Sequence, residues 1–272
     1  MYVIPPSKTT KKELKNMFQK VLHNFEKEEF KLVNVSLLWM PYYTVECFYQ
    51  DEYGFTEQSE TTMNVMLYSD ALEGKDIIFL FRPNFLQYRP KKREEIYLNN
   101  VLGEYREVKG PTAKVDFRKI SRKVTEFMEN VRDKLTDLRS KVKFEYEPSI
   151  VRLFTGSKHA FERLSSKFMR EGLRDMEKEV AYLSSMELLT KIFLNLRSLP
   201  QDLEMHKTQE FYFPYLTMYL ERKEKEPYEK FYFISLVKVG RLLKKFREDV
   251  LLTRITEKYN ELNQLMKSLV IY

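Results

Sequence analysis

Apolar residues recur at helical spacing near the start of the chain. Leu14, Phe18, Val21 and Phe25 are separated by three or four positions, which places them on one face of a helix. The stretch from Thr10 to Glu13 has the pattern of a capping box, in which two side chains satisfy the free backbone groups of a first turn. The pattern therefore predicts an N-terminal helix with one packed face.

The pattern then changes to alternation of apolar and polar residues, which is the period of a half-buried strand. Pro41 interrupts the first alternating stretch, and we expect the chain to leave the ladder there. Asp51 to Gly54 and Leu72 to Lys75 read as turns between strands. The strands that this pattern predicts cover residues 33–39, 42–49, 63–67 and 77–81. Together they predict an antiparallel β-meander after the N-terminal helix.

Prolines and glycines break up residues 83–115, and we place a domain boundary near residue 110. Beyond it, Asp116 can cap a long helix that runs to about Phe144, and a second long helix runs from about Ser157 to Leu199. Apolar residues in the first of these helices step by four and three, as in a heptad seam. They are Val124, Met128, Val131, Leu135, Leu138 and Val142. We expect the two helices to pair as an antiparallel, coiled-coil-like hairpin.

A later stretch repeats the pattern of an earlier one. Residues 39–45 and 212–218 each place a proline between aromatic residues and a threonine three positions after it. Either a helix-plus-hairpin unit is duplicated, or two aromatic strands that tolerate proline match by chance. A hairpin near 210–236 and a last helix over 237–269 complete the expected elements.

The predicted fold is thus α+β, with an N-terminal helix and antiparallel meander in a domain over 1–110. Long coiled-coil-like helices and a second small hairpin follow in a mainly helical domain over 111–272. Hydrophobic residues make up 43% of the 272 residues, which excludes wholesale disorder. Cys47 is the only cysteine, so no intrachain disulfide can form. No signal peptide and no apolar stretch long enough to span a bilayer is visible, and we expect a cytoplasmic protein without membrane insertion.

No arrangement of residues predicts catalysis. The three histidines are scattered, the full pattern of a phosphate-binding loop is missing, and Cys47 alternates with Val45 and Tyr49 as a buried residue would. We therefore expect no cofactor, no metal and no enzyme. One catalytic alternative stays open, because a helix followed by a meander resembles the restriction-endonuclease-like core in order. Its candidate residues, which would gather Mg²⁺ and an activated water, are the carboxylates of Glu46, Asp70 and Glu73 together with Lys75.

The net charge is +7, and the basic residues gather in clusters. Residues 77–93 hold five basic residues and no acid, with Tyr88 among them as a ring on which a base could stack. An acidic stretch at 51–76 offsets these clusters, so the charge is segregated along the chain. The residues that we expect to contact nucleic acid are Arg82, Tyr88, Arg89, Lys91, Lys92, Arg93, Arg163, Lys167, Arg170, Arg174, Lys238, Arg241, Lys244 and Lys245.

These observations favour a nucleic-acid-binding accessory subunit, directed at single strands or at the phosphate backbone, that also docks on a protein partner or self-associates through its helices. A pure protein–protein adaptor is the alternative, because heptad seams and aromatic edge strands also serve as docking surfaces. The Lys-, Tyr-, Phe- and Leu-rich composition resembles that of orphan proteins of archaea and their mobile or defence elements. A mobile-element or defence system is one setting that this composition suggests.

Overall fold

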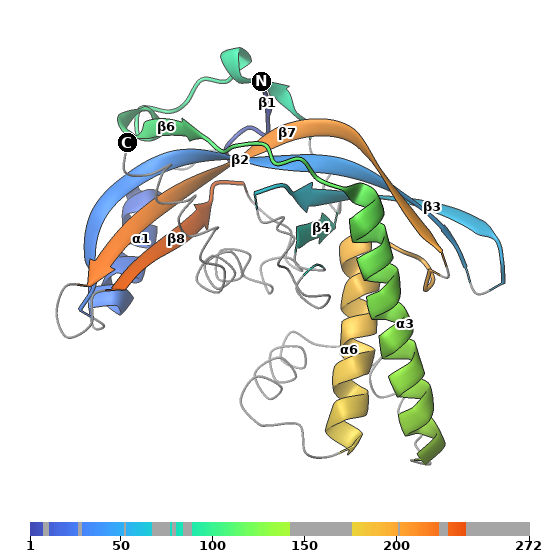
Figure 1. Ribbon diagram of the computed structural model, residues 1–272. Helices are drawn as coiled ribbons and strands as arrows, with labels where there is room; N and C mark the ends of the chain where they lie inside the picture. Colours follow the sequence, from blue (N-terminus) through green and yellow to red (C-terminus); the bar gives the residue numbers. More distant parts are fainter. Residues whose placement is uncertain are drawn as a thin grey trace.

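The computed structural model describes residues 1–7, 11–26, 29–51, 53–66, 77, 80–83, 89–141, 176–200, 202–222 and 228–237. These residues form an α+β mixture built on one large, arched sheet of eight strands (Figure 1). Helix α1 (Lys11–Glu26) lies near one end of the sheet, and α3 (Phe117–Lys141) and α6 (Met176–Leu194) extend side by side from the other.

The centre of the sheet is an antiparallel pair of 20-residue strands, β2 (Lys31–Gln50) and β7 (Leu203–Arg222). The strand order is β4-β3-β2-β7-β1-β5, with β6 paired to β2 and β8 paired to β7. The pairs β2–β6 and β1–β7 are parallel, which makes the sheet mixed. The bounds of the six outer strands are β1 Tyr2–Val3, β3 Thr56–Asn64, β4 Phe81–Pro83, β5 Lys91–Lys92, β6 Arg106–Lys109 and β8 Tyr228–Ser235.

Two prolines lie in the middle of β2 and β7 without ending either strand. The carbonyl of Pro41 accepts a hydrogen bond from Val65, and the carbonyl of Pro214 accepts one from Leu236. A residue's N–H and C=O point to the same side of a strand, so the missing donor of Pro41 faces the outer edge of β2. On that edge the neighbour of β2 changes from β6 to β3 at this point. Each proline therefore sits where its strand changes neighbour, and no ladder bond is lost.

The predicted fold is wrong in its arrangement. The expected meander and the expected second hairpin are one sheet, because β2 pairs with β7 along nearly its whole length. The strand that Pro41 was expected to interrupt runs without a break. Local alternation shows that a segment is a strand, but it does not show which distant strand lies beside it.

The long coiled-coil-like helices are also wrong for the part of the chain that the structure describes, which holds three α-helices. Val124 and Met128 of α3 pack into the main core together with Leu189 and Phe193 of α6, and the second half of α3 meets α6 in a separate cluster. There Val131, Leu135 and Leu138 are buried with Val180 and Leu183 of α6. Apolar residues at alternating spacings of four and three positions also fit a helix that packs on a sheet and on a neighbouring helix.

The end of α6 is fixed to the sheet by polar side chains. The last carbonyls of a helix lack partners within the helix. The Ser59 hydroxyl of β3 donates to the Leu194 carbonyl at 3.0 Å, and the Thr61 hydroxyl donates to the Phe193 carbonyl at 2.6 Å. Asn195 ends the helix in the left-handed conformation, with φ of 55°. The chain therefore leaves α6 at a fixed angle and enters β7.

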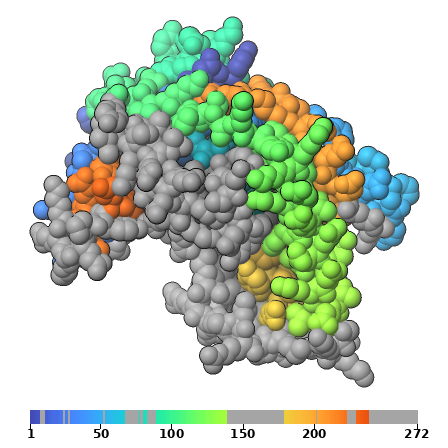
Figure 2. Space-filling view, in the orientation of Figure 1, coloured from blue at the N-terminus to red at the C-terminus, as the bar shows by residue number. Residues whose placement is uncertain are grey.

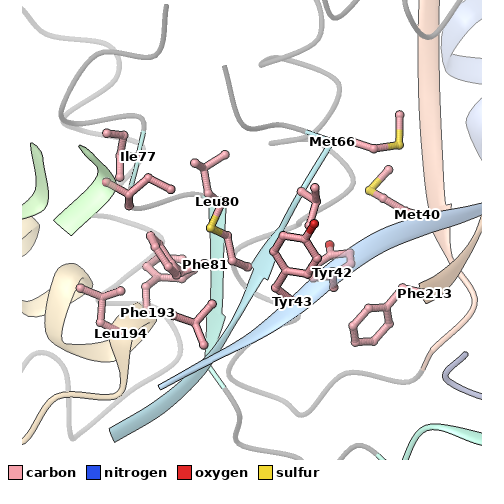
Figure 3. Close-up of a cluster of buried hydrophobic side chains, with 14 of the residues drawn as sticks. Met40, Tyr42, Tyr43, Met66, Ile77, Leu80, Phe81, Phe193, Leu194 and Phe213 are labelled. Atoms are coloured by element: carbon pink, nitrogen blue, oxygen red, sulfur yellow. The ribbon is translucent and has the colours of Figure 1, made fainter. Parts of the chain in front are cut away.

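The main core contains aromatic and sulfur-bearing side chains from both central strands (Figure 3). The ring centres of Tyr42 and Phe213 lie 4.6 Å apart in an edge-to-face arrangement, and the Tyr42 hydroxyl is 3.0 Å from that of Tyr215. Gly110 follows β6 and lies at the edge of β2, where its amide donates to the Trp39 carbonyl at 2.9 Å. A Cβ there would lie 2.6 Å from the Met66 sulfur, so only glycine allows this close approach.

The contact between α3 and α6 can be tested at Leu135. Replacement by Ala should lower the free energy of unfolding by about 2–5 kcal/mol, because it leaves a cavity in a buried cluster. Urea unfolding followed by circular dichroism measures the change, and Lys134→Ala on the exposed side of α3 is the matched control. A Leu135→Ala protein as stable as the control would show that this side chain does not pack against α6.

Candidate nucleic-acid interface

Three of the predicted basic residues lie at the surface near β5. Arg89, Lys91 and Lys92 are exposed, and Lys91 and Lys92 form the last strand at one side of the sheet. Lysines on an edge strand also prevent the pairing of exposed edges between molecules, so their position alone does not establish a binding role.

Arg93 is held within the fold. Its guanidinium binds both carboxylate oxygens of Glu107 on β6 and donates to the Ile96 carbonyl at 3.0 Å. It also lies 5.6 Å from the centre of the Trp39 ring, and the Trp39 indole N–H donates to the same carboxylate at 2.7 Å. The hydrogen bonds from Arg93 are the main reason that the pKa of Glu107 is lowered. This group joins β6 and β2 to the segment that follows β5.

Arg82 lies inside the protein, with 3% of its surface exposed. Its guanidinium carbon is 4.7 Å from the centre of the Phe213 ring, and the Thr61 and Thr62 hydroxyls donate to its backbone carbonyl. A phosphate in solvent cannot reach this guanidinium in the structure as it stands. The remaining predicted residues lie outside the described residues: Tyr88, Arg163, Lys167, Arg170, Arg174, Lys238, Arg241, Lys244 and Lys245.

The structure brings together a second set of basic residues that sequence reasoning missed. They line a hollow of about 550 Å³ between the start of α3 and the start of β7, which we call the basic hollow. Figure 2 shows these two segments side by side at the surface, α3 in green and β7 in orange. The basic hollow is lined by Lys114, Val115, Asp116, Phe117, Arg118, Met205, His206 and Lys207.

Contacts connect the basic hollow to the middle of the sheet. The Lys207 ammonium lies 4.4 Å from the centre of the Tyr43 ring and 3.8 Å from a carboxylate oxygen of Glu210. The Tyr212 hydroxyl donates to Glu210 at 2.8 Å, and the Lys109 ammonium lies 5.1 Å from the centre of the Tyr212 ring. Lys109 and Lys207 are therefore linked through Tyr212 and Glu210, and Tyr43 lies beside Lys207.

The two tyrosines keep their protons near neutral pH. Burial is the main cause that raises the pKa of Tyr43 and of Tyr212, and the charge of Glu210 raises both further. Both residues therefore remain uncharged, and the cations of Lys109 and Lys207 lie over neutral rings.

The start of α3 contributes because of its local sequence. Asp116 caps the helix through its side chain, which accepts a hydrogen bond from the Lys119 amide at 3.2 Å. Arg118 follows in the first turn, and Lys114 precedes the cap. No local cluster of charge marks these residues in the sequence, because Lys207 comes from a strand far along the chain. The basic hollow forms because the start of α3 packs against the start of β7, a contact between distant segments that no local sequence pattern predicts.

The candidate residues for metal-dependent cleavage are only partly described. Glu46 on β2 lies opposite Glu60 on β3 and His206 on β7 in the sheet register. Asp70, Glu73 and Lys75 lie outside the described residues. Within the ranges that the structure describes, no three or more His, Cys, Asp or Glu side chains are placed to hold a metal ion.

Comparisons with known proteins give no family for this chain. No family model, no curated protein and no solved structure matches it. Among the helices that the structure describes, none is both long and apolar enough to cross a membrane.

The Arg93–Glu107–Trp39 group makes stability depend on pH. Because the folded pKa of Glu107 is lowered, its contribution is present above the unfolded value of 4.5 and is lost as pH falls through the folded value. Glu107→Gln should lower the free energy of unfolding by about 1 kcal/mol at neutral pH, a modest value because the pair is partly exposed.

The difference between wild type and Glu107→Gln should shrink as the pH is lowered below 4.5. Thermal unfolding over a pH series measures it, with Glu94→Gln on the exposed turn after β5 as the control. A difference that stays constant down to acid pH would show that the charge of Glu107 does not contribute.

Cys47 provides a test of burial within the central sheet. The side chain is fully buried, and burial raises the pKa of its thiol to about 12. The native protein should therefore resist alkylation by iodoacetamide at mildly alkaline pH, whereas the urea-unfolded protein should react once per chain. Mass spectrometry measures the label, with Cys47→Ser as the unlabelled control. Rapid labelling of native protein would contradict the placement of Cys47.

Proposed function

We propose that this protein is a non-enzymatic accessory subunit that binds nucleic acid through its phosphate backbone. The observation that carries the proposal is the basic hollow, where Lys114, Arg118 and Lys207 meet from two distant parts of the chain. Several cations on one surface are what non-specific affinity for a polyphosphate requires, because each neutralised phosphate releases condensed counterions.

The acidic residues near the basic hollow already have partners. Asp116 caps α3, and Glu210 accepts the Tyr212 hydroxyl and lies beside Lys207. Glu204 is 3.5 Å from His206. These carboxylates reduce the local positive charge, but their positions leave Lys114 and Arg118 exposed to solvent.

The basic surface extends from the basic hollow toward β5. Lys91 is opposite Val3, and Val3 is opposite Tyr212, over which Lys109 lies. Two strand spacings separate β5 from β7, which is roughly 10 Å. Lys207 precedes Tyr212 by five residues of β7, roughly 17 Å, so one strand of nucleic acid is long enough to contact Lys91, Lys109 and Lys207.

A protein–protein adaptor is the second candidate function. The observation that favours it is the turn between β2 and β3, where Tyr53 and Phe55 are largely exposed. Large exposed aromatic side chains are enriched in protein interfaces.

The nucleic-acid role can be tested by removing three cations of the basic hollow. The triple variant Lys114→Ala, Arg118→Ala and Lys207→Ala should bind a fluorescent single-stranded oligonucleotide about tenfold or more weakly at low salt. The slope of log affinity against log salt should fall by roughly 0.7 for each lost phosphate contact. Fluorescence anisotropy over a salt series measures both quantities, and circular dichroism checks that the variant is folded.

The matched control removes the same charge elsewhere. Lys12, Lys15 and Lys20 are exposed on α1, which lies away from α3 (Figure 1). Their triple alanine variant should keep most of the affinity. Equal losses in the two variants would show that only net charge matters, and absence of binding by the wild type at low salt would end the proposed function.

A further inference from the structure

The turn between β2 and β3 presents two aromatic side chains to solvent, and we call Asp51, Tyr53, Gly54 and Phe55 the hairpin tip. Tyr53 is 77% exposed and Phe55 is 69% exposed. The tip lies at the end of the long hairpin, beyond the helices that cover the sheet (Figure 1). Each ring leaves a large apolar surface in water, which burial against a partner would remove at a gain of roughly 25 cal/mol per Å².

The hairpin tip is held in one conformation by its own hydrogen bonds. The Asp51 carboxylate accepts from the amides of Tyr53 at 2.9 Å and Phe55 at 2.8 Å. The Asp51 amide donates to the Phe55 carbonyl, and Gly54 adopts a left-handed φ of 83° that favours glycine. These bonds order the backbone of the tip, which lowers the entropy cost of docking.

The charge around the hairpin tip is unsuited to nucleic acid. Asp51 lies in the tip and Glu57 follows it on β3. The Gln50 amide donates to the Asp202 carbonyl at 3.3 Å, which brings a third acidic residue to this end of the sheet. Arg197 offsets part of this charge, because its guanidinium is 3.7 Å from Glu57. The remaining negative charge disfavours phosphates and favours a partner surface that is apolar with a basic rim.

The basic hollow has these two properties. Val115, Phe117 and Met205 give it apolar surface, and Lys114, Arg118 and Lys207 give it a basic rim. Its volume of about 550 Å³ can receive an aromatic side chain. We infer that the hairpin tip of one copy docks in the basic hollow of a second copy, and that the chain self-associates through this contact.

The positions of the two surfaces permit a reciprocal contact. Lys207 is opposite Val45 on β2, and the hairpin tip begins at Asp51, directly after the last residue of that strand. Six residues of strand span roughly 20 Å, so the tip and the hollow lie at the same end of the molecule. A two-fold axis between two copies can then place each tip in the other copy's hollow, which closes the assembly as a dimer.

The test joins the two surfaces chemically. One variant carries Thr56→Cys beside the hairpin tip, which keeps both aromatic rings, and a second carries Arg118→Cys at the basic hollow, which keeps Lys114 and Lys207. Native Cys47 is buried and its thiol pKa is raised to about 12, so it does not react with a maleimide. When the two variants are mixed, a bismaleimide should link one chain of each kind.

The control replaces Thr56→Cys by Tyr97→Cys, since Tyr97 is 97% exposed and belongs to neither surface. This pair should give no crosslink above background. Adding Tyr53→Ser and Phe55→Ser to the Thr56→Cys chain should abolish the product, and light scattering should show the mass falling from that of two chains to that of one. A crosslink no stronger than the Tyr97 control, or one that survives the two serine substitutions, would overturn the inference.

The self-association and the nucleic-acid role are tested by separate measurements. Oligonucleotide binding by the protein with Tyr53→Ser and Phe55→Ser tests the proposed function alone, because the basic hollow of that variant is intact. Crosslinking in the absence of nucleic acid tests the self-association alone.

Discussion

The antiparallel pairing of β2 with β7 is the constraint on which the rest of the structure depends. It joins Lys31–Gln50 to Leu203–Arg222 along almost their whole length. Each of the other strands pairs, directly or through a neighbour, with one of these two. The chain enters β7 from α6, and β3 follows β2. The pairing of β7 with β2 therefore brings the end of α6 to β3, where Ser59 and Thr61 bind its last carbonyls. The free-energy cost of closing so long a loop is offset by the buried rings of Tyr42, Phe213 and their neighbours.

The two strands are related in a way that explains the repeated sequence pattern. Met40 is opposite Phe213, Trp39 is opposite Pro214, and Pro41 is opposite Tyr212. The two similar stretches therefore pair with each other around an approximate two-fold axis at Met40 and Phe213. Each is preceded by a helix and followed by a hairpin partner, α1 and β3 for the first and α6 and β8 for the second. This arrangement is what pairing between two copies of a helix-plus-hairpin unit produces.

The sequence predicted features that depend only on residues close together along the chain. Asp116 caps α3, Leu14 is buried on α1, and Cys47 is a buried residue of β2. The sequence did not reveal contacts that depend on distant pairing. The sequence predicted that Arg82 is a surface cation within a basic cluster. The register of β4 instead places its guanidinium beside Phe213. Arg93 read in the same way, yet β6 brings Glu107 to it. No sequence pattern predicted the basic hollow, because Lys114 and Lys207 lie far apart along the chain.

Segregation of charge gives the two proposals a common physical basis. The basic hollow and the acidic hairpin tip lie at one end of the same sheet, and the two proposals assign to the hollow either a phosphate or the tip of a second copy. Two ligands that exclude each other at one site are thermodynamically coupled. Nucleic acid in the hollow would weaken self-association, and self-association would weaken the affinity for nucleic acid by the same factor. The two contacts differ in their dependence on salt. A phosphate contact is electrostatic and weakens steeply with ionic strength, whereas docking of Tyr53 and Phe55 also buries apolar surface, which salt does not screen. If both proposals hold, rising salt shifts the hollow from nucleic acid toward the hairpin tip.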